Sequence, residues 1–370
     1  MRADSITLEG FRNYALSSCS FGGGVNVIVG DNAQGKTNLL EALYLGATGR
    51  SFRTRTDKEL IGFDRDFALI SLRGFSYERE RKTEITLRRG GRRTMVSNGV
   101  KLKTAAELSE SFSAVLFCPE DLGLIREGAA VRRKLMDGCL CQLWPRYAQC
   151  LSLFNRAYEQ KTRILRDWEE SPELLDLLPE YDVQMARYSA ELIRYRGAYA
   201  KRLAEEARRI HAEFSTGEEL GCTYRTVKTV TDTSADVETI YNQVLEHTRS
   251  HSQAERASGL CLSGAHKDDL EITVNGQDAR AYASQGQCRT AALSLKLAER
   301  EIHFTRRGEY PILLLDDVLS ELDPARQSFI LNRVMGGQVF ITCCEDAGLI
   351  AERTGGRIIT VRAGAMEAQE

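Results

Sequence analysis

Residues 30–37, with the sequence GDNAQGKT, match the phosphate-binding pattern G-x-x-x-x-G-K-[ST]. The glycines let the backbone curl so that its N–H groups face phosphate oxygens. We expect Lys36 to reach the β- and γ-phosphates and the Thr37 hydroxyl to bind Mg²⁺. The loop follows a predicted buried strand at 24–30 and opens a predicted helix at 37–45. The chain is therefore predicted to bind a nucleoside triphosphate through the residues of this loop and the next position: Gly30, Asp31, Asn32, Ala33, Gln34, Gly35, Lys36, Thr37 and Asn38.

Two aspartates follow a second buried strand near the end of the chain. The segment ILLLDDVLSELD (312–323) has four apolar residues and then Asp316 and Asp317. A strand that ends there can aim Asp316 at the Mg²⁺ held by Thr37, and Asp317 can orient or deprotonate an attacking water. Lys36, Asp316 and Asp317 are therefore the predicted catalytic residues, with Thr37 and Asp316 as metal ligands.

A third short motif, SQGQ, precedes a predicted helix at 287–304. The N-terminus of a helix with small residues can approach an anion closely through its backbone N–H groups. The phosphate loop and the acidic strand lie at opposite ends of the chain, so the nucleotide site is split between distant segments. This layout, with a Ser/Gly/Gln motif shortly before the acidic strand, is that of ABC-type ATPases. The motif adds four predicted ATP contacts: Ser284, Gln285, Gly286 and Gln287.

The remaining pattern alternates strands and helices around a helical block. Strand patterns occur at 6–14, 67–102, 114–122, 220–230, 270–276, 311–318 and 337–343, and those at 67–102 form a β-meander with glycine-containing turns. From 124 to 215 the apolar residues follow helical spacing instead. We predict an α/β fold with a mixed sheet, a β-meander and flanking helices. The predicted ATP-binding lobe is 1–123 with 216–370, and the predicted inserted helical lobe is 124–215.

Seven segments in this order make the chain similar to the RecF family, bacterial recombinational-repair ATPases of the SMC-like ABC class. They are LEGFRNY (8–14), GDNAQGKTNLLEAL (30–43), GRSFRT (49–54), FCPEDL (117–122), GAHKDDLEI (264–272), SQGQ and LLLDDVLSELD. The resemblance implies an ABC-type SMC head without a long coiled coil, with ATP and Mg²⁺ as cofactors. It also implies an ATP-dependent head-to-tail homodimer, in which Ser284 of one subunit contacts the γ-phosphate held by the other.

The resemblance further implies DNA and protein partners. RecF-like proteins bind DNA in an ATP-dependent way, favour boundaries between single and double strands, and act with RecO and RecR to load RecA at gaps. Slow, DNA-stimulated ATP hydrolysis would release the dimer, with roles in replication, repair and the SOS response. Arginines and lysines on exposed elements can supply the phosphate contacts. The candidate DNA-binding residues are Arg53, Arg55, Arg89, Arg92, Arg93, Arg132 and Arg133.

Four positions depart from the ABC pattern or leave a choice open. Asp317 stands where many ABC ATPases have glutamate, and its shorter side chain favours slow turnover. The segment FITCCEDAGL (340–349) has no histidine to sense the γ-phosphate, and Thr342 is a candidate substitute. Glu120 or Asp121 is expected in the metal- and water-sensing loop.

Composition and charge favour a soluble, folded, cytoplasmic protein without membrane partners. The longest apolar runs are too short to span a bilayer, the N-terminus lacks a signal-peptide pattern, and the net charge is −2. The ten cysteines form no C-x-x-C pattern, which favours reduced, buried thiols.

His266 or Lys267 could lie near nucleotide or DNA, or have a structural role. Two other functions remain open: an ABC ATPase that energises a transporter, and an interaction protein that binds ATP and barely hydrolyses it.

Overall fold

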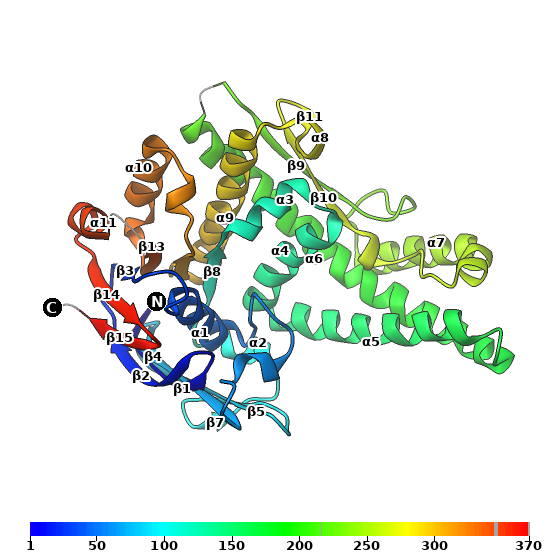
Figure 1. Ribbon diagram of the computed structural model, residues 1–370. Helices are drawn as coiled ribbons and strands as arrows, with labels where there is room; N and C mark the ends of the chain where they lie inside the picture. The colour runs from blue at the N-terminus through cyan, green and yellow to red at the C-terminus, as the bar shows by residue number, and fades with distance from the viewer. Residues whose placement is uncertain (216, 344–346, 369–370) are drawn as a thin grey trace. The chain divides into compact units, whose positions relative to one another are not determined.

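The computed structural model describes residues 1–215, 217–343 and 347–368 and divides into two compact units. Unit 1 comprises Met1–Asp121 and Lys296–Glu370, and unit 2 comprises Leu122–Leu295, so the two ends of the chain share unit 1 (Figure 1). Unit 2 extends further than the predicted insertion, which ended at 215. The reason is that β9 (Leu220–Arg225) and α7 (Val237–Ser258) pack against α6 (Leu178–Phe214), the long helix of that insertion.

Unit 1 contains a mostly parallel sheet with the strand order β15-β14-β3-β13-β12-β8. The strands are β3 (Val25–Val29), β8 (Ala114–Phe117), β12 (Ile312–Leu315), β13 (Val339–Cys343), β14 (Arg357–Arg362) and β15 (Ala365–Ala368). β15 runs antiparallel to β14, and the other pairs are parallel. β8, β12 and β13 are buried at every residue, as in strands covered on both faces. Their carboxyl ends, and that of β3, therefore meet at one edge of the sheet.

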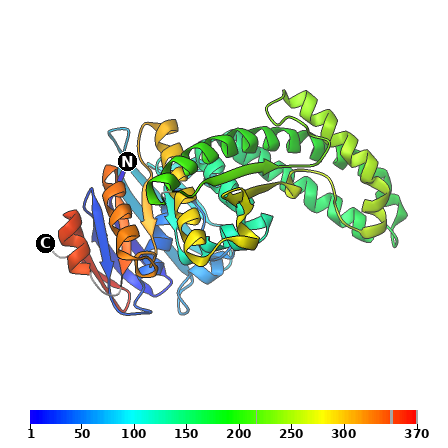
Figure 2. The ribbon, with the colours of Figure 1, turned by 90° about the horizontal axis from the view of Figure 1, so that it is seen from above.

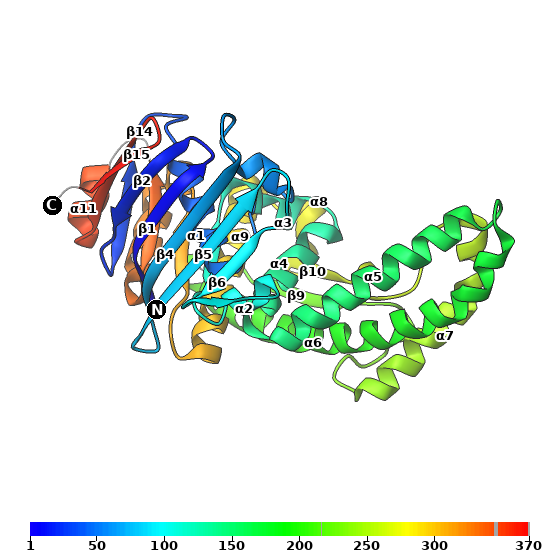
Figure 3. The same ribbon diagram turned by 90° about the horizontal axis from the view of Figure 1, so that it is seen from below.

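A second sheet of unit 1 is antiparallel, with the order β2-β1-β4-β5-β6-β7, and its strands β4 to β7 correspond to the meander predicted at 67–102 (Figure 3). Its strands are β1 (Arg2–Phe11), β2 (Tyr14–Ser20), β4 (Phe67–Ser76), β5 (Arg79–Arg88), β6 (Thr94–Ser97) and β7 (Val100–Lys101). Tyr77 and Glu78 join β4 to β5 in a tight turn with φ of 50° and 58°. Positive φ at both central residues matches the twist of the flanking strands. Thr83, Ile85 and Leu87 of β5 alternate with more exposed residues, so one face of the sheet is buried.

The helix α1 (Lys36–Thr48) contacts strands of both sheets and buries Leu39, Leu40 and Leu43 in their shared core. Because this helix begins at the phosphate loop, the core fixes the direction in which the loop points. The other helical segments of unit 1 are η1 (Asp57–Leu60), α2 (Ala105–Leu108), η5 (Leu319–Glu321), α10 (Pro324–Arg333), η6 (Val334–Gly336) and α11 (Ala347–Thr354).

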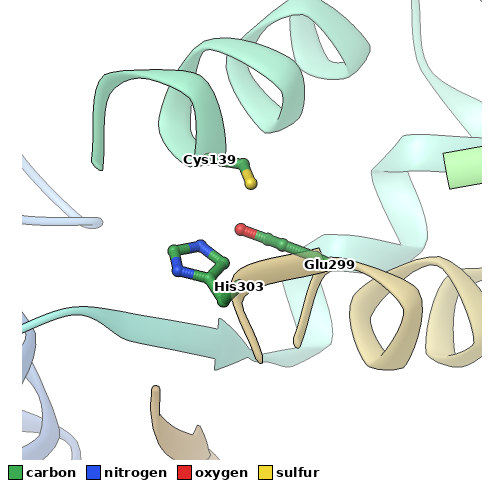
Figure 4. A group of neighbouring side chains, drawn as sticks. All are labelled: Cys139, Glu299 and His303. Atoms are coloured by element: carbon green, nitrogen blue, oxygen red, sulfur yellow. The ribbon is translucent and has the colours of Figure 1, made fainter. Parts of the chain in front are cut away.

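The helix α9 (Gln285–Arg307) contributes its first half to unit 2 and its second half to unit 1. In unit 1 it buries Lys296 with its ion-pair partner Glu299. Figure 4 labels Glu299 and His303 on this helix, together with Cys139 of unit 2. Burial lowers the pKa of His303 to about 3, so this imidazole is neutral.

Unit 2 is built on two long antiparallel helices, α5 (Pro145–Asp167) and α6, which lie side by side (Figures 2 and 3). The helical spacing of apolar residues predicted for 124–215 is confirmed for these two helices, since Tyr147, Phe154, Leu192 and Leu203 are all buried. α7 was missing from the sequence prediction because buried polar residues interrupt its apolar spacing. The other segments are η2 (Pro119–Leu122), which crosses the unit boundary, α3 (Gly123–Arg126), α4 (Ala129–Leu143), η3 (Pro172–Leu177), η4 (Ala265–Lys267), β10 (Asp269–Val274), β11 (Gln277–Asp278) and α8 (Ala279–Tyr282).

Among the described residues, no helix is both long and apolar enough to cross a membrane. Of the nine cysteines that the structure describes, eight are buried. Burial raises the pKa of several of these thiols, which keeps them protonated and unreactive.

Candidate nucleotide-binding site

The phosphate loop connects the end of β3 to the start of α1, as predicted. Gly30 and Gly35 have φ of 154° and 121°, a region that side chains disfavour. A Cβ at Gly30 would lie 2.3 Å from the carbonyl oxygen of Val361, and one at Gly35 would lie 2.8 Å from Nδ2 of Asn13. Both glycines are therefore required by the backbone conformation and by close neighbours.

The turn between β1 and β2 braces this loop. Nδ2 of Asn13 donates to the carbonyl of Gln34 at 2.8 Å, and the hydroxyl of Tyr14 donates to the carbonyl of Gly35 at 2.9 Å. Oδ1 of Asn13 also accepts a hydrogen bond from Nδ2 of Asn38 at 2.8 Å. The LEGFRNY segment thus holds two loop carbonyls in place, which leaves the loop free to direct its N–H groups at phosphate.

Lys36 folds back over the loop. Its Nζ donates to the carbonyl of Gly30 at 2.6 Å and to that of Asp31 at 3.1 Å. The ammonium group is therefore held inside the curl, where a bound polyphosphate would meet it. Its contact with the β- and γ-phosphates stays a prediction of the motif.

Asp316 and Thr37 meet at the carboxyl edge of the parallel sheet. Oγ1 of Thr37 donates to Oδ1 of Asp316 at 3.1 Å, although the residues are 279 positions apart. Oγ1 of Thr342, near the end of β13, donates to the same oxygen at 2.9 Å and accepts from the backbone N of Asp317 at 2.8 Å. A hydroxyl beside a carboxylate is a suitable oxygen set for Mg²⁺. The CED part of the FITCCEDAGL segment falls on 344–346, outside the described residues.

Burial raises the pKa of Asp316, and the negative charges of Glu120 and Asp317 act in the same direction. The hydrogen bonds from Thr342 and Thr37 oppose the shift. Three carboxylates gathered at one edge repel one another, and a divalent cation would relieve this repulsion.

Asp317 itself is exposed and has a φ of 51°. Aspartate tolerates this left-handed conformation better than most residues. Its Oδ1 accepts a hydrogen bond from the Ser320 hydroxyl at 2.9 Å, which orients the carboxylate. The side chain is thus placed next to Asp316 with access to solvent water.

The structure distinguishes the two candidates for the sensing loop after β8. Oδ2 of Asp121 accepts a hydrogen bond from the backbone N of Cys118 at 3.0 Å, so this carboxylate caps its own loop. Glu120 is exposed, and its charge reaches Asp316. β8 and β12 are paired, with the N of Asp316 donating to the carbonyl of Phe117 at 2.9 Å. Glu120 is therefore the better candidate.

A hollow of about 270 Å³ borders the brace of the phosphate loop. Its lining residues are Gly10, Arg12, Asn13, Tyr14, Ala15, Gly62, Phe63, Asp64 and Arg65. The side chain of Phe63 is 100% exposed, which is unusual for an aromatic residue without a partner. Arg89 holds the loop behind it, since Nη2 donates to the carbonyls of Gly62 and Phe63 at 2.9 and 2.8 Å. Sequence reasoning missed Phe63, because the segment around it has no motif.

Residues 3–365 match the family model described as RecF/RecN/SMC N terminal domain. The chain is 38% identical over 363 residues to the DNA replication and repair protein RecF of Acetivibrio thermocellus, covering 98% of each chain. It is 38% identical to the protein of the same name from Clostridium kluyveri, covering 91% of each. The chain belongs to the RecF family.

Solved structures agree with this assignment. The structure described as the recombination mediator protein RecF-ATPrS in the RecFOR pathway has a TM-score of 0.93 and 33% identity, covering 100% of this chain and 98% of the other. The corresponding RecF-ATP structure has a TM-score of 0.89 and 34% identity, covering 100% and 97%. An Smc head domain from Pyrococcus furiosus has a TM-score of 0.55 at 18% identity over 99% of this chain and 95% of the other, which supports the SMC-head fold alone. RecF proteins act in DNA replication and repair, so the transporter alternative is not favoured.

The SQGQ motif of this RecF-family chain forms the first turn of α9 in unit 2. The N of Gln287 donates to Oγ of Ser284 at 3.2 Å, and the N of Ser284 donates to Oε1 of Gln287 at 2.8 Å. This reciprocal pair is a capping box, which stabilises the start of a helix. Ser284 and Gln285 are exposed, and Gly286 is half-buried. The motif therefore exposes Ser284 and Gln285 to solvent, in a different unit from the phosphate loop.

Four of the arginines predicted to bind DNA have structural contacts instead. Arg132 is buried, and its Nε and Nη2 donate to Oδ1 and Oδ2 of Asp269 at 2.7 and 2.9 Å. Arg133 donates to the carbonyl of Asp268 at 2.6 Å. Arg93 pairs with Asp57, and Arg89 holds the loop before β4 as described above. A run of arginines in the sequence does not reveal such partners, because they come from distant segments.

The remaining three arginines are exposed at the surface of unit 1. Nη1 of Arg53 donates to Oδ1 of Asn38 at 2.7 Å, which places this guanidinium beside the start of α1. Arg55 and Arg92 are exposed and form no hydrogen bond or ion pair with the described residues. These three are the exposed members of the predicted DNA-binding set.

The GAHKDDL segment has a structural role at two of its positions. Asp268 is fully buried and accepts hydrogen bonds from Arg196 and Thr226, both at 2.6 Å. Nε2 of His266 donates to the carbonyl of Cys261 at 3.0 Å, and burial lowers the pKa of His266 to about 4. Lys267 is exposed, whereas His266 is half-buried.

Proposed function

We propose that this protein is an ATP-dependent dimeric clamp on DNA, in which ATP joins two subunits and slow hydrolysis releases them. The observation that carries the proposal is the hydrogen bond between Thr37 and Asp316, which brings the first and last segments of the chain to the phosphate loop. The solved RecF structures with ATP and its analogue support ATP as the nucleotide.

In this proposal unit 1 binds ATP and prepares hydrolysis. Lys36 turns from the loop carbonyls to the β- and γ-phosphates. When Mg²⁺ is bound through Thr37 and Asp316, it neutralises charge on the phosphate oxygens. Asp317 orients a water whose oxygen attacks the γ-phosphorus as the bond to the β-phosphate oxygen breaks. The water proton passes to Asp317 or to solvent, and ADP leaves with that bridging oxygen.

The hollow beside the phosphate loop suits the nucleoside end of ATP. Phe63 offers an exposed ring face on which a purine can stack, and Arg12 and Asn13 line the same hollow. The position of Arg12 is held by Glu41, a buried carboxylate on α1 that accepts two hydrogen bonds from its guanidinium at 2.8 and 2.9 Å. The base and the phosphates would thus be bound by neighbouring parts of unit 1.

The exposed SQGQ turn supplies the second half of the site in a partner subunit. Ser284 and the N–H groups of the first turn of α9 can bind the γ-phosphate held by the partner, aided by the helix dipole. Two such contacts related by a two-fold axis give a symmetric dimer with two composite sites. ATP then favours the dimer because it binds the dimer better than the monomer.

DNA binding follows from the family and from the exposed arginines Arg53, Arg55 and Arg92. We propose that the clamp engages boundaries between single and double strands, acts with RecO and RecR to load RecA, and contributes to the SOS response. This role places the protein in the cytoplasm.

The decisive experiment is Ser284→Arg, measured by sedimentation with and without ATP. The variant is expected to bind ATP as the wild type does and to remain monomeric. Normal ATP-dependent dimerisation of Ser284→Arg would overturn the composite site. An interaction protein that barely hydrolyses ATP is the second candidate, and dimerisation together with unmeasurable turnover in the wild type would favour it.

A further inference from the structure

The carboxylate of Glu218, in unit 2, accepts a hydrogen bond from the SQGQ turn. Nε2 of Gln287 donates to Oε1 of Glu218 at 2.9 Å. A carboxylate accepts hydrogen bonds but donates none, so the NH₂ group of Gln287 must face Glu218. The amide oxygen then points the other way and accepts from the backbone N of Ser284 at 2.8 Å. Glu218 therefore selects the amide orientation that completes the capping box.

Glu218 also lies beside the last turn of α6. His211, in that turn, is fully buried, and its Nε2 is 3.6 Å from Oε2 of Glu218. The other ring nitrogen, Nδ1, lies 3.2 Å from Oγ of Ser294 on α9. The C-terminal end of α6 thus contacts α9 directly, through Ser294, and reaches its first turn through Glu218 and Gln287.

We propose that Glu218 is a positioning residue that ties the SQGQ turn to the C-terminal end of α6. The binding of a partner's ATP by Ser284 then depends on the position of α6. A contact that moves this 37-residue helix would therefore change how Ser284 binds the nucleotide. Without Glu218 the Gln287 amide can rotate, the N–H of Ser284 loses its acceptor, and the first turn of α9 frays. This inference rests on the proposed function, in which Ser284 acts across the dimer.

The test compares Glu218→Ala with Glu219→Ala. Glu219 is the adjacent carboxylate, has a side chain that is 68% exposed and pairs with Arg208 at 3.4 Å, so its removal makes the same charge change without the contact to Gln287. We expect Glu218→Ala to weaken ATP-dependent dimerisation about ten-fold, the size expected for one charged hydrogen bond. ATP binding by the monomer should not change, because the phosphate loop lies in unit 1. Glu218→Gln keeps an acceptor oxygen and should restore most of the dimerisation.

Hydrogen exchange of the nucleotide-free protein gives a readout that does not involve dimerisation. The amides of Gln287 and Cys288 should exchange faster in Glu218→Ala than in Glu219→Ala. Because Glu218 acts through Gln287, the double variant Glu218→Ala/Gln287→Ala should dimerise no worse than Gln287→Ala alone. An additive loss in the double variant would overturn the inference.

Ser284→Arg, measured in the same series, separates the two claims. If Ser284→Arg stays monomeric while Glu218→Ala behaves like Glu219→Ala in both assays, the positioning role is wrong and the proposed function stands. If Ser284→Arg dimerises normally, the composite site fails and the inference fails with it.

Discussion

The phosphate loop in unit 1 is braced by segments that lie far apart in the chain, whereas the SQGQ turn in unit 2 faces solvent and is held by few contacts. Asn13 and Tyr14 reach the loop from the β1–β2 turn and the start of β2, and Asp316 reaches its helix from the end of β12. The SQGQ turn has its capping box and the contact to Glu218. The half that binds ATP in a single subunit is thus prepared in advance. In the proposed dimer, the SQGQ turn acts only after the subunits pair, and its exposure and few contacts suit such a switch.

The largest effect is expected from Lys36→Ala in the braced half. Removing the ammonium group leaves the phosphate charge without its nearest protein cation, so ATP turnover should fall about 10³-fold. Turnover and ATP affinity can be measured together, with Lys101→Ala as an exposed lysine control. Retained ATP binding and hydrolysis would show that the loop acts without Lys36. The conclusion that unit 1 holds a prepared ATP-binding half would then be contradicted.

Asp317→Asn should have the next largest effect and should separate hydrolysis from pairing. The amide keeps the shape of the side chain but is a poor proton acceptor, so turnover should fall about 100-fold. ATP affinity and the ATP-dependent dimer should persist, because Lys36, Thr37 and Ser284 are unchanged. Single-turnover hydrolysis and sedimentation test this, and loss of the dimer in parallel with turnover would contradict it.

Phe63→Ala tests the base hollow at the edge of the braced half. Loss of one stacking face should weaken ATP binding about ten-fold and leave the maximal turnover nearly unchanged. Phe63→Tyr should bind ATP normally, and Leu16→Ala removes another exposed apolar side chain as a control. An unchanged affinity in Phe63→Ala would exclude this hollow as the nucleoside site.

The smallest effect is expected from Arg92→Ala, compared with its neighbour Arg93→Ala. Arg92 is exposed, so its loss should weaken DNA binding a few-fold and reduce the salt slope by about 1 without changing the thermal stability. Arg93 pairs with Asp57 and donates to the carbonyl of Gly49, so Arg93→Ala should lower the unfolding temperature. Equal DNA affinity of Arg92→Ala and the wild type across a salt series would remove Arg92 from the DNA surface.

The site could be predicted from the sequence wherever its chemistry depends on local backbone geometry. The glycine spacing of the phosphate loop and the apolar run before Asp316 each specify their own conformation. The structure then places Thr37, Asp316 and Thr342 in one hydrogen-bonded group. The ion pair of Arg132 could not be predicted for the opposite reason, because its partner Asp269 comes from β10, a distant segment of the chain.

The sequence by itself determined the phosphate loop, the acidic strand, the SQGQ turn and the α/β alternation, because each is encoded by residues adjacent in the chain. The tertiary structure decided that the charge of Glu120 acts on Asp316 while Asp121 caps its own loop, that Phe63 is exposed beside the phosphate loop, and that Glu218 accepts a hydrogen bond from Gln287. These outcomes depend on which side chains from distant segments meet and which remain in water, and no local pattern in the chain encodes that.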